Sequence, residues 1–171
     1  MTAISTTTVK PILVIGVGNS IQMDDGIGIH LLAHLEKESL PDTVELFDGG
    51  TAGLDLLPFL QHRDTVIVID AVDADMEPGT LFRFTPEDIA AKRQSYDSLH
   101  QLGLLETLKM AGLLGTAPAH AIIIGVQPGI IDWGEELSEP LRKRIPRIVE
   151  LVLEEVQQAQ HRYQVNECQH P

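Results

Sequence analysis

The sequence contains one cysteine, Cys168, in a chain of 171 residues. A single cysteine excludes an internal disulfide and a cysteine-rich metal site. Positive charge is also scarce, because 12 lysines and arginines stand against 25 aspartates and glutamates, which gives a net charge of −13 at pH 7. Such a surface repels phosphate backbones and anionic lipid. The composition therefore argues against nucleic-acid binding and against a role at a membrane surface.

Long apolar runs are missing as well. No stretch approaches the roughly 18 apolar residues that span a bilayer, and the threonine-rich first ten residues lack the apolar core of a signal peptide. We therefore expect a cytoplasmic protein without membrane insertion. Hydrophobic residues make up 43% of the chain and charged residues 22%, which is typical of a globular domain. The length predicts one domain over residues 12–160, with tails at residues 1–11 and 161–171.

The apolar segments alternate between strand and helix patterns. Strands are expected at residues 12–18, 44–47, 65–72, 80–84 and 121–126. The fourth strand is expected to be antiparallel, because the connection before it is too short for a parallel crossover. Helices are expected at residues 26–39, 52–62, 99–114 and 138–160, with Pro146 kinking or splitting the last one. This order predicts an α/β fold, a three-layer α/β/α sandwich with a mostly parallel twisted sheet of about five strands and one antiparallel strand.

Acidic side chains follow three of the expected strands. Asp24 and Asp25 come shortly after the first strand, Asp48 ends the second, and Asp70 ends the third. In open α/β sheets, ligands bind beyond the carboxyl ends of the strands. The carboxylates are therefore expected to converge on one edge of the sheet. Because an anionic edge attracts a cation, a metal site is favoured there over a phosphate site.

Structural roles stay open for some of these acids. One of Asp24 and Asp25 can serve as a cap or first-turn residue of the following helix. Asp48 stands before two glycines and can form a turn. Asp70 is harder to explain in this way, because a carboxylate that closes an apolar strand is costly to bury without a partner.

Other site types find little support in the pattern. Gly16-Val17-Gly18 begins like a dinucleotide fingerprint, but Ile21 stands where the third glycine belongs. No Gly-x-Ser-x-Gly nucleophile elbow is present. Among the seven histidines, His30 and His34 are interpreted as packing or surface residues, since the segment between them lacks the glutamate of a zinc-protease helix. His100 opens a helix after a polar loop, and its own pattern leaves its role undecided.

Several segments together resemble the hydrogenase maturation endopeptidases. They are Gly16–Asn19 with Asp24–Gly28, then Asp48–Gly53, Ile69–Ala71 and His100–Leu104. They occur in the family's order and at its approximate spacing, and the likeness spans about residues 12 to 157. Members of this family remove a C-terminal extension from the large subunit of nickel–iron hydrogenases once the active-site metals are in place.

The resemblance implies a metal-dependent endopeptidase that acts on a nickel–iron hydrogenase large-subunit precursor after nickel insertion. The family's metal ligands correspond to Asp25, Asp70 and His100. Many relatives have glutamate at the first of these positions, so the shorter Asp25 changes the reach of that ligand. Two carboxylates and one imidazole form a mixed oxygen and nitrogen site with open coordination positions. The resemblance implies that nickel arrives with the substrate, and zinc, cadmium or manganese are possible substitutes.

Two routes to peptide cleavage stay open. Either the metal polarises the scissile carbonyl or activates water, or Asp48 acts as a base. In the second case the substrate groove is lined by Gly49, Gly50 and Thr51. The alternative function is a non-catalytic, metal-sensing, chaperone-like binder of the same precursor. We expect a monomer in either case.

Overall fold

A five-stranded sheet forms the centre of the protein. The computed structural model describes residues 9–91 and 99–169, without the side chains of residues 89–91 and 99–102. The strands are β1 (Ile12–Val17), β2 (Val44–Gly50), β3 (Thr65–Ala71), β4 (Leu81–Phe84) and β5 (His120–Val126). Their order in the sheet is β2-β1-β3-β5-β4, and each neighbouring pair is parallel except β4 with β5. The predicted sheet, including its one antiparallel strand, is confirmed.

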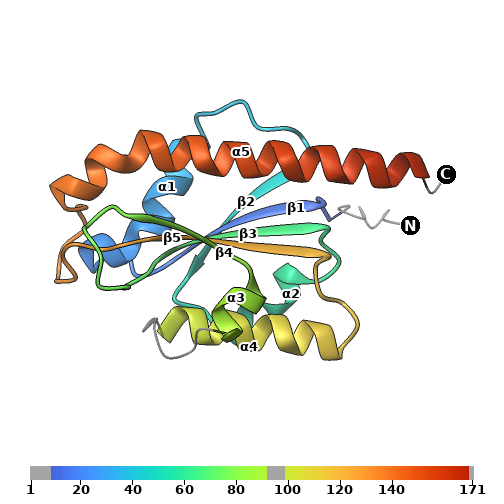
Figure 1. Ribbon diagram of the computed structural model, residues 1–171, viewed down its shortest axis with the longest axis horizontal. Coiled ribbons are helices and arrows are strands. Elements are labelled where there is room, and N and C mark those ends of the chain that lie inside the picture. Colours follow the sequence, from blue (N-terminus) through green and yellow to red (C-terminus); the bar gives the residue numbers. More distant parts are fainter. Residues whose placement is uncertain (1–8, 92–98, 170–171) are drawn as a thin grey trace, which may run out of the picture.

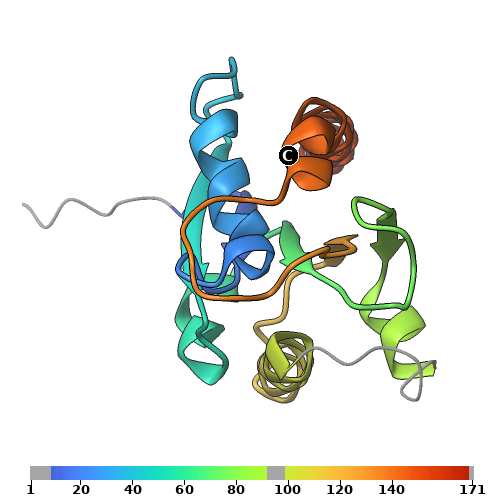
Figure 2. The same cartoon turned by 90° about the vertical axis from the view of Figure 1, so that its left-hand side faces the viewer.

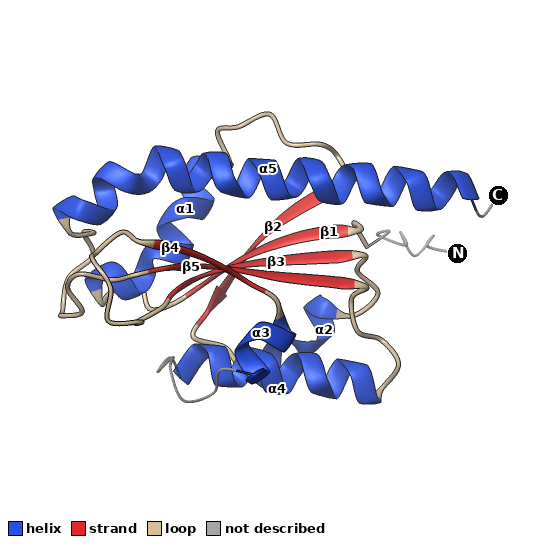
Figure 3. Cartoon of the chain, in the orientation of Figure 1, coloured by secondary structure: helices blue, strands red, loops and turns tan. Residues whose placement is uncertain are grey.

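Helices cover both faces of this sheet (Figures 1 and 3). One layer holds α1 (Ile27–Leu35), which follows the short 3-10 turn η1 (Met23–Gly26), and the long α5 (Glu139–Gln169). The other layer holds the turn η2 (Leu54–Leu56) with α2 (Leu57–Leu60), α3 (Pro86–Ala91) and α4 (Leu99–Leu113). The predicted three-layer α/β/α sandwich is therefore confirmed. None of the helices within the described residues is both long enough and apolar enough to cross a membrane.

Alternation along β3 assigns its side chains to the two layers. Ile67, Ile69 and Ala71 belong to the core beneath α1 and α5. Val66 and Val68 belong to the core beneath α2 and α4. Successive side chains of a strand point to opposite faces. Asp70 therefore faces the layer of α2 and α4.

Two helix predictions are too long. The first helix ends at Leu35 rather than at residue 39, since only exposed or partly exposed polar residues follow and turn hydrogen bonds close the chain there. The helix expected at residues 52–62 is reduced to η2 and the four-residue α2. Pro58 is the second residue of α2, within the first turn, where its missing N–H and fixed φ are tolerated, so α2 starts just before this proline instead of running through it.

The last helix is longer than predicted and is not split. Helix α5 runs unbroken through Pro146 and continues to Gln169, beyond the expected end at residue 160. Leu141 lies before the proline and Ile148 and Val152 lie after it, and all three are fully buried in one core. This shared apolar stripe holds both parts of α5 on the sheet despite the lost backbone hydrogen bond.

Candidate functional site

The carboxyl ends of the parallel strands meet at one edge of the sheet, which faces the viewer in Figure 2. Turn η1, the end of β2 and the start of α4 lie at this edge. The segment 127–138, drawn in orange between β5 and α5, curves around the start of α1 at the same edge (Figure 2). The predicted site residues sit on these elements, so the fold places them at one edge of the sheet, as the sequence predicts.

Helix α1 lies unusually close to the central strands. A Cβ atom on Gly28 would lie 2.4 Å from the carbonyl oxygens of both Ile69 and Val17. A Cβ atom on Gly16 would lie 2.3 Å from the carbonyl oxygen of Gly28. Only glycine permits this approach of backbone to backbone. The approach holds η1, which precedes α1, against the end of β3, where Asp70 lies.

Asp25 is half-buried in η1, and its carboxylate is held by the loop after β1. The backbone N–H of Asn19 donates to Asp25 Oδ2 at 2.8 Å. Gly18 has φ +130°, and a Cβ atom there would lie 1.9 Å from the carbonyl oxygen of Asp25. The tight turn from β1 to η1 therefore fixes the position of Asp25 at the edge.

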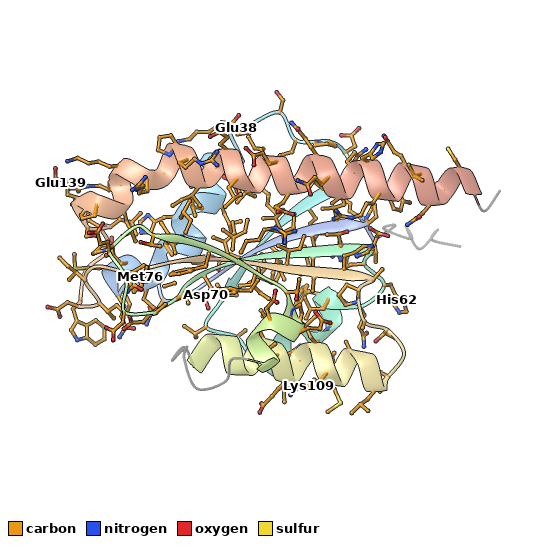
Figure 4. The ribbon with its side chains drawn as sticks, in the orientation of Figure 1. Glu38, His62, Asp70, Met76, Lys109 and Glu139 are labelled. Atoms are coloured by element: carbon orange, nitrogen blue, oxygen red, sulfur yellow. The ribbon has the colours of Figure 1, made fainter. Side chains whose placement is uncertain are left out.

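Asp70 is the second predicted ligand, and it is 1% exposed at the end of β3. It pairs in register with Gly125 of β5. In Figure 4 it lies on the side of the sheet that α4 covers. A carboxylate that is so deeply buried in an apolar sheet fits a ligand role, because buried charges in proteins are paired or coordinate metals.

His100, the third predicted ligand, is the second residue of α4, and its side chain lies outside the described part of the structure. The backbone places the start of α4 near the end of β2. One turn beyond His100, a Cβ atom on Gly103 would lie 3.2 Å from the Cα atom of Gly53. Among the side chains that the structure describes, no three histidine, cysteine, aspartate or glutamate groups are gathered as metal ligands. The set Asp25, Asp70 and His100 stays a prediction, and its donor chemistry fits a divalent cation.

The segment from Asp48 to Thr51 forms the end of β2 and a turn. Asp48 is exposed, and its Oδ1 accepts the backbone N–H of Gly50 at 2.9 Å. This hydrogen bond supports the alternative in which Asp48 serves to form a turn. Asp48 pairs with Gly16, whose α-carbon faces α1, so Asp48 points to the opposite face from Asp70. The structure does not bring Asp48 together with Asp70, and the catalytic role of Asp48 stays a prediction.

Two glycines follow Asp48, so no side chain projects from the backbone at the end of β2. A Cβ atom on Gly49 would lie 2.8 Å from Ile15 Cγ2, and Gly50 adopts φ +51°. The backbone N–H of Gly18 donates to the carbonyl oxygen of Gly50 at 2.8 Å, which joins this turn to the loop that carries Asp25. The predicted substrate groove of Gly49, Gly50 and Thr51 therefore adjoins the candidate metal site through the backbone.

Asp24 has a role that the sequence pattern does not indicate. It is fully buried and accepts four hydrogen bonds, from the backbone N–H groups of Gly129, Ile130 and Ser138 and from Ser138 Oγ, at 2.7–2.8 Å. It does not cap α1, whose N-cap residue is Gly26. Its partners lie more than 100 residues away, so no local pattern reveals them. Of the two neighbouring acids, Asp24 is structural, and the ligand role of Asp25 stays a prediction.

We expect Asp24→Asn to lower the free energy of unfolding by about 2 to 3 kcal/mol, since an amide replaces a carboxylate that accepts hydrogen bonds from four donors. Chemical denaturation measures this loss. The matched control is Asp132→Asn, because Asp132 is exposed and its Oδ1 accepts the backbone N–H of the neighbouring Trp133. Equal losses in both variants would contradict the structural role of Asp24.

One further carboxylate at this edge has a shifted pKa. The side-chain amide of Gln127 donates to Asp73 Oδ1 at 3.0 Å, and the backbone N–H of Asp75 donates to the same oxygen at 3.2 Å. These bonds lower the pKa of Asp73 below its ordinary value, against a smaller opposing effect of burial. Asp73 is therefore ionised at neutral pH and adds to the negative potential of the edge.

Comparison with known proteins gives one consistent result. The family model for hydrogenase maturation proteases matches residues 29–155. The hydrogenase expression/formation protein HupD of Bradyrhizobium diazoefficiens is 38% identical over 146 residues, covering 82% of this chain and 74% of that protein. The hydrogenase 2 maturation protease of Escherichia coli K12 is 36% identical over 144 residues, covering 83% of this chain and 88% of the relative.

Solved structures agree with the sequence matches. The hydrogenase maturating endopeptidase HybD from Escherichia coli superposes with a TM-score of 0.80 at 35% identity, covering 86% of this chain and 93% of that one. The [NiFe] hydrogenase maturation protease HybD from Thermococcus kodakarensis gives a TM-score of 0.71 at 25% identity, covering 85% and 98%.

Proposed function

This chain belongs to the hydrogenase maturation protease family and is an endopeptidase, and from that premise we propose that it removes the C-terminal extension of a nickel–iron hydrogenase large-subunit precursor after nickel insertion. The observation that carries the proposal is the buried Asp70 at the end of β3, with η1 and Asp25 packed beside it. In this proposal the protein distinguishes a nickel-filled precursor from an empty one, and a buried carboxylate at an open sheet edge would be one ligand of the site that does so.

In this proposal the nickel belongs to the substrate. Asp25, Asp70 and His100 would hold it, two as carboxylate ligands and one as an imidazole ligand. The bound metal is a Lewis acid that can polarise the neighbouring carbonyl group or acidify a bound water. The role of the chain is to dock the precursor tail so that the scissile bond lies next to that metal, which reserves cleavage for precursors that carry it.

The chain's own backbone supports the docking of the tail. The turn leaves room beside the sheet edge at Gly50, where a Cβ atom would meet nothing within 4 Å, whereas Gly49 packs against Ile15. Asp48 holds this turn through its hydrogen bond to Gly50. The hydrogen bond from Gly18 to Gly50 fixes the distance between this turn and the loop of Asp25. An extended peptide on Gly49, Gly50 and Thr51 would thus be presented to the candidate metal ligands.

We expect the wild-type protein to cleave a nickel-loaded precursor and to leave a nickel-free precursor intact. Tail residues beyond the scissile bond contribute little differential binding if nickel provides the docking point. Intact-mass analysis of both precursors, incubated in parallel, measures the loss of the extension. Binding without any change of mass would favour the non-catalytic metal-sensing binder. Equal cleavage of both precursors would refute nickel sensing and leave the peptidase assignment standing.

A further inference from the structure

We propose that an apolar surface beside the candidate site docks the folded body of the protein substrate, separately from its tail. This edge patch consists of Ile21, Met76, Ile130, Ile131 and Trp133. The partner face that it fits is apolar at its centre and basic at its rim. The inference rests on the proposed function, since it names the second contact through which that site would recognise its substrate.

The members of the edge patch are large apolar side chains that are left exposed. Trp133 is 75% exposed, Met76 55%, Ile131 54%, Ile130 48% and Ile21 44%. Trp133 is the only tryptophan of the chain. Scattered exposed apolar residues are ordinary, but a contiguous group of them marks an interaction surface. Tryptophan is also the residue type that most often dominates the binding energy of an interface.

Backbone hydrogen bonds hold together the loops that carry these residues. The N–H of Gly134 donates to the carbonyl oxygen of Ile21 at 3.0 Å, which brings Trp133 beside Ile21. The N–H of Asp24 donates to the carbonyl oxygen of Ile130 at 3.2 Å. The buried carboxylate of Asp24 holds the same segment from beneath through Gly129 and Ile130. The patch is therefore carried on a fixed backbone, which lowers the entropy cost of binding.

Met76 joins the patch through the neighbouring turn. Its backbone N–H donates to Gln127 Oε1 at 3.2 Å, and Gln127 opens the segment that carries Ile130. A Cβ atom on Gly129 would lie 3.1 Å from Pro78 Cβ, so the two loops are in contact. Figure 4 shows Met76 beyond Asp70, at the end of the molecule where the parallel strands end.

The patch is continuous with the candidate site. Ile21 lies in the loop between Asn19 and Asp25, whose two ends are tied together by the hydrogen bond from Asn19 to Asp25. Figure 2 shows the orange segment 127–138 passing around the start of α1. A folded protein seated on the patch would therefore have its emerging tail close to Asp25.

Charge defines the chemistry of the partner. None of the 12 lysines and arginines lies within residues 11–36, 64–82 or 110–141, the three stretches that carry the patch. The loops that carry the patch also carry the exposed acids Asp73, Asp75, Glu77, Asp132, Glu135 and Glu136, of which Glu136 pairs with Arg142. A basic rim on the partner complements these acids and speeds association. A second copy of this chain is disfavoured as the occupant, because two acidic rims would face each other.

The test uses the double variant Trp133→Ala/Ile131→Ser in cleavage of the nickel-loaded, full-length precursor. We expect KM to rise at least tenfold while kcat stays within a factor of two. The matched control is Leu113→Ser/Leu114→Ser at the end of α4, on the opposite edge of the sheet, where the two leucines are 84% and 56% exposed. This control should leave KM unchanged.

Asp132→Lys tests the rim and should also raise KM, whereas Asp42→Lys on a remote loop should not.

The outcomes separate this inference from the proposed function. An unchanged KM in the double variant, with normal cleavage by the wild type, overturns the docking surface and leaves the function intact. If the wild type does not cleave, the proposed function fails, and calorimetric titration of the precursor into the wild type and the double variant decides the docking alone. Equal affinities would overturn it. A wild-type dimer in sedimentation that the double variant abolishes would also overturn it, because the patch would then join two copies of this chain.

Discussion

Replacing Gly28 by alanine should lower the free energy of unfolding by about 3 kcal/mol or more, which places it among the most destabilising single substitutions. The added Cβ atom would lie 2.4 Å from two carbonyl oxygens and 2.7 Å from the backbone nitrogen of Val17. These atoms belong to the two central strands, β1 and β3, and cannot give way without disturbing the sheet. Chemical denaturation of the purified variant measures the effect.

Gly28→Ala should also reduce the cleavage activity of the fraction of the protein that stays folded. Moving α1 outward separates η1 from the end of β3, and with it Asp25 from Asp70. The matched control is Gly112→Ala in α4, where a Cβ atom meets nothing within 4 Å. Because alanine favours a helix over glycine, this control should be neutral or stabilising by up to about 1 kcal/mol. Equal stability of the two variants would mean that α1 does not depend on this close approach.

The strands and the edge that carries the site are predictable from sequence because the signals are local. Strand β3 is a continuous run of apolar residues from Val66 to Ile69, and it is buried on both faces as such runs predict. The topological rule for open α/β sheets then assigns the acid that follows to the ligand-binding edge. The antiparallel β4 is predictable for the same reason, since the length of its preceding connection is visible in the sequence.

Features that depend on distant partners are not predictable in this way. Asp24 and Asp25 are adjacent and chemically identical, and only the fold shows that Asp24 binds Gly129 and Ser138. Helix α5 passes through Pro146 because tertiary packing on both sides outweighs a local helix breaker. The edge patch is likewise invisible in the sequence, because it joins loops that are more than 50 residues apart, at Ile21, Met76 and Trp133.

Asp70→Asn should lower the rate of cleavage at least about 100-fold. It should leave the metal-free protein as stable as the wild type, or more stable by about 1 kcal/mol. Without metal, Asp70 and Asp25 stand at one edge of a chain with a net charge of −13, and removing one of two like charges relieves repulsion. Most substitutions of buried residues have the opposite effect on stability. Thermal unfolding in chelator measures the stability, and intact-mass analysis of the nickel-loaded precursor measures the cleavage.

Added nickel distinguishes a ligand from a scaffold residue. A metal that binds only the folded state stabilises it by mass action, by about 2.7 kcal/mol at 100 times its dissociation constant. We expect this gain in the wild type and in Asp42→Asn, an exposed carboxylate on a remote loop, and not in Asp70→Asn or His100→Ala. If Asp70→Asn instead unfolds more easily in chelator, and nickel leaves the wild type unchanged, then Asp70 serves the scaffold and the metal ligands must be sought elsewhere on the edge.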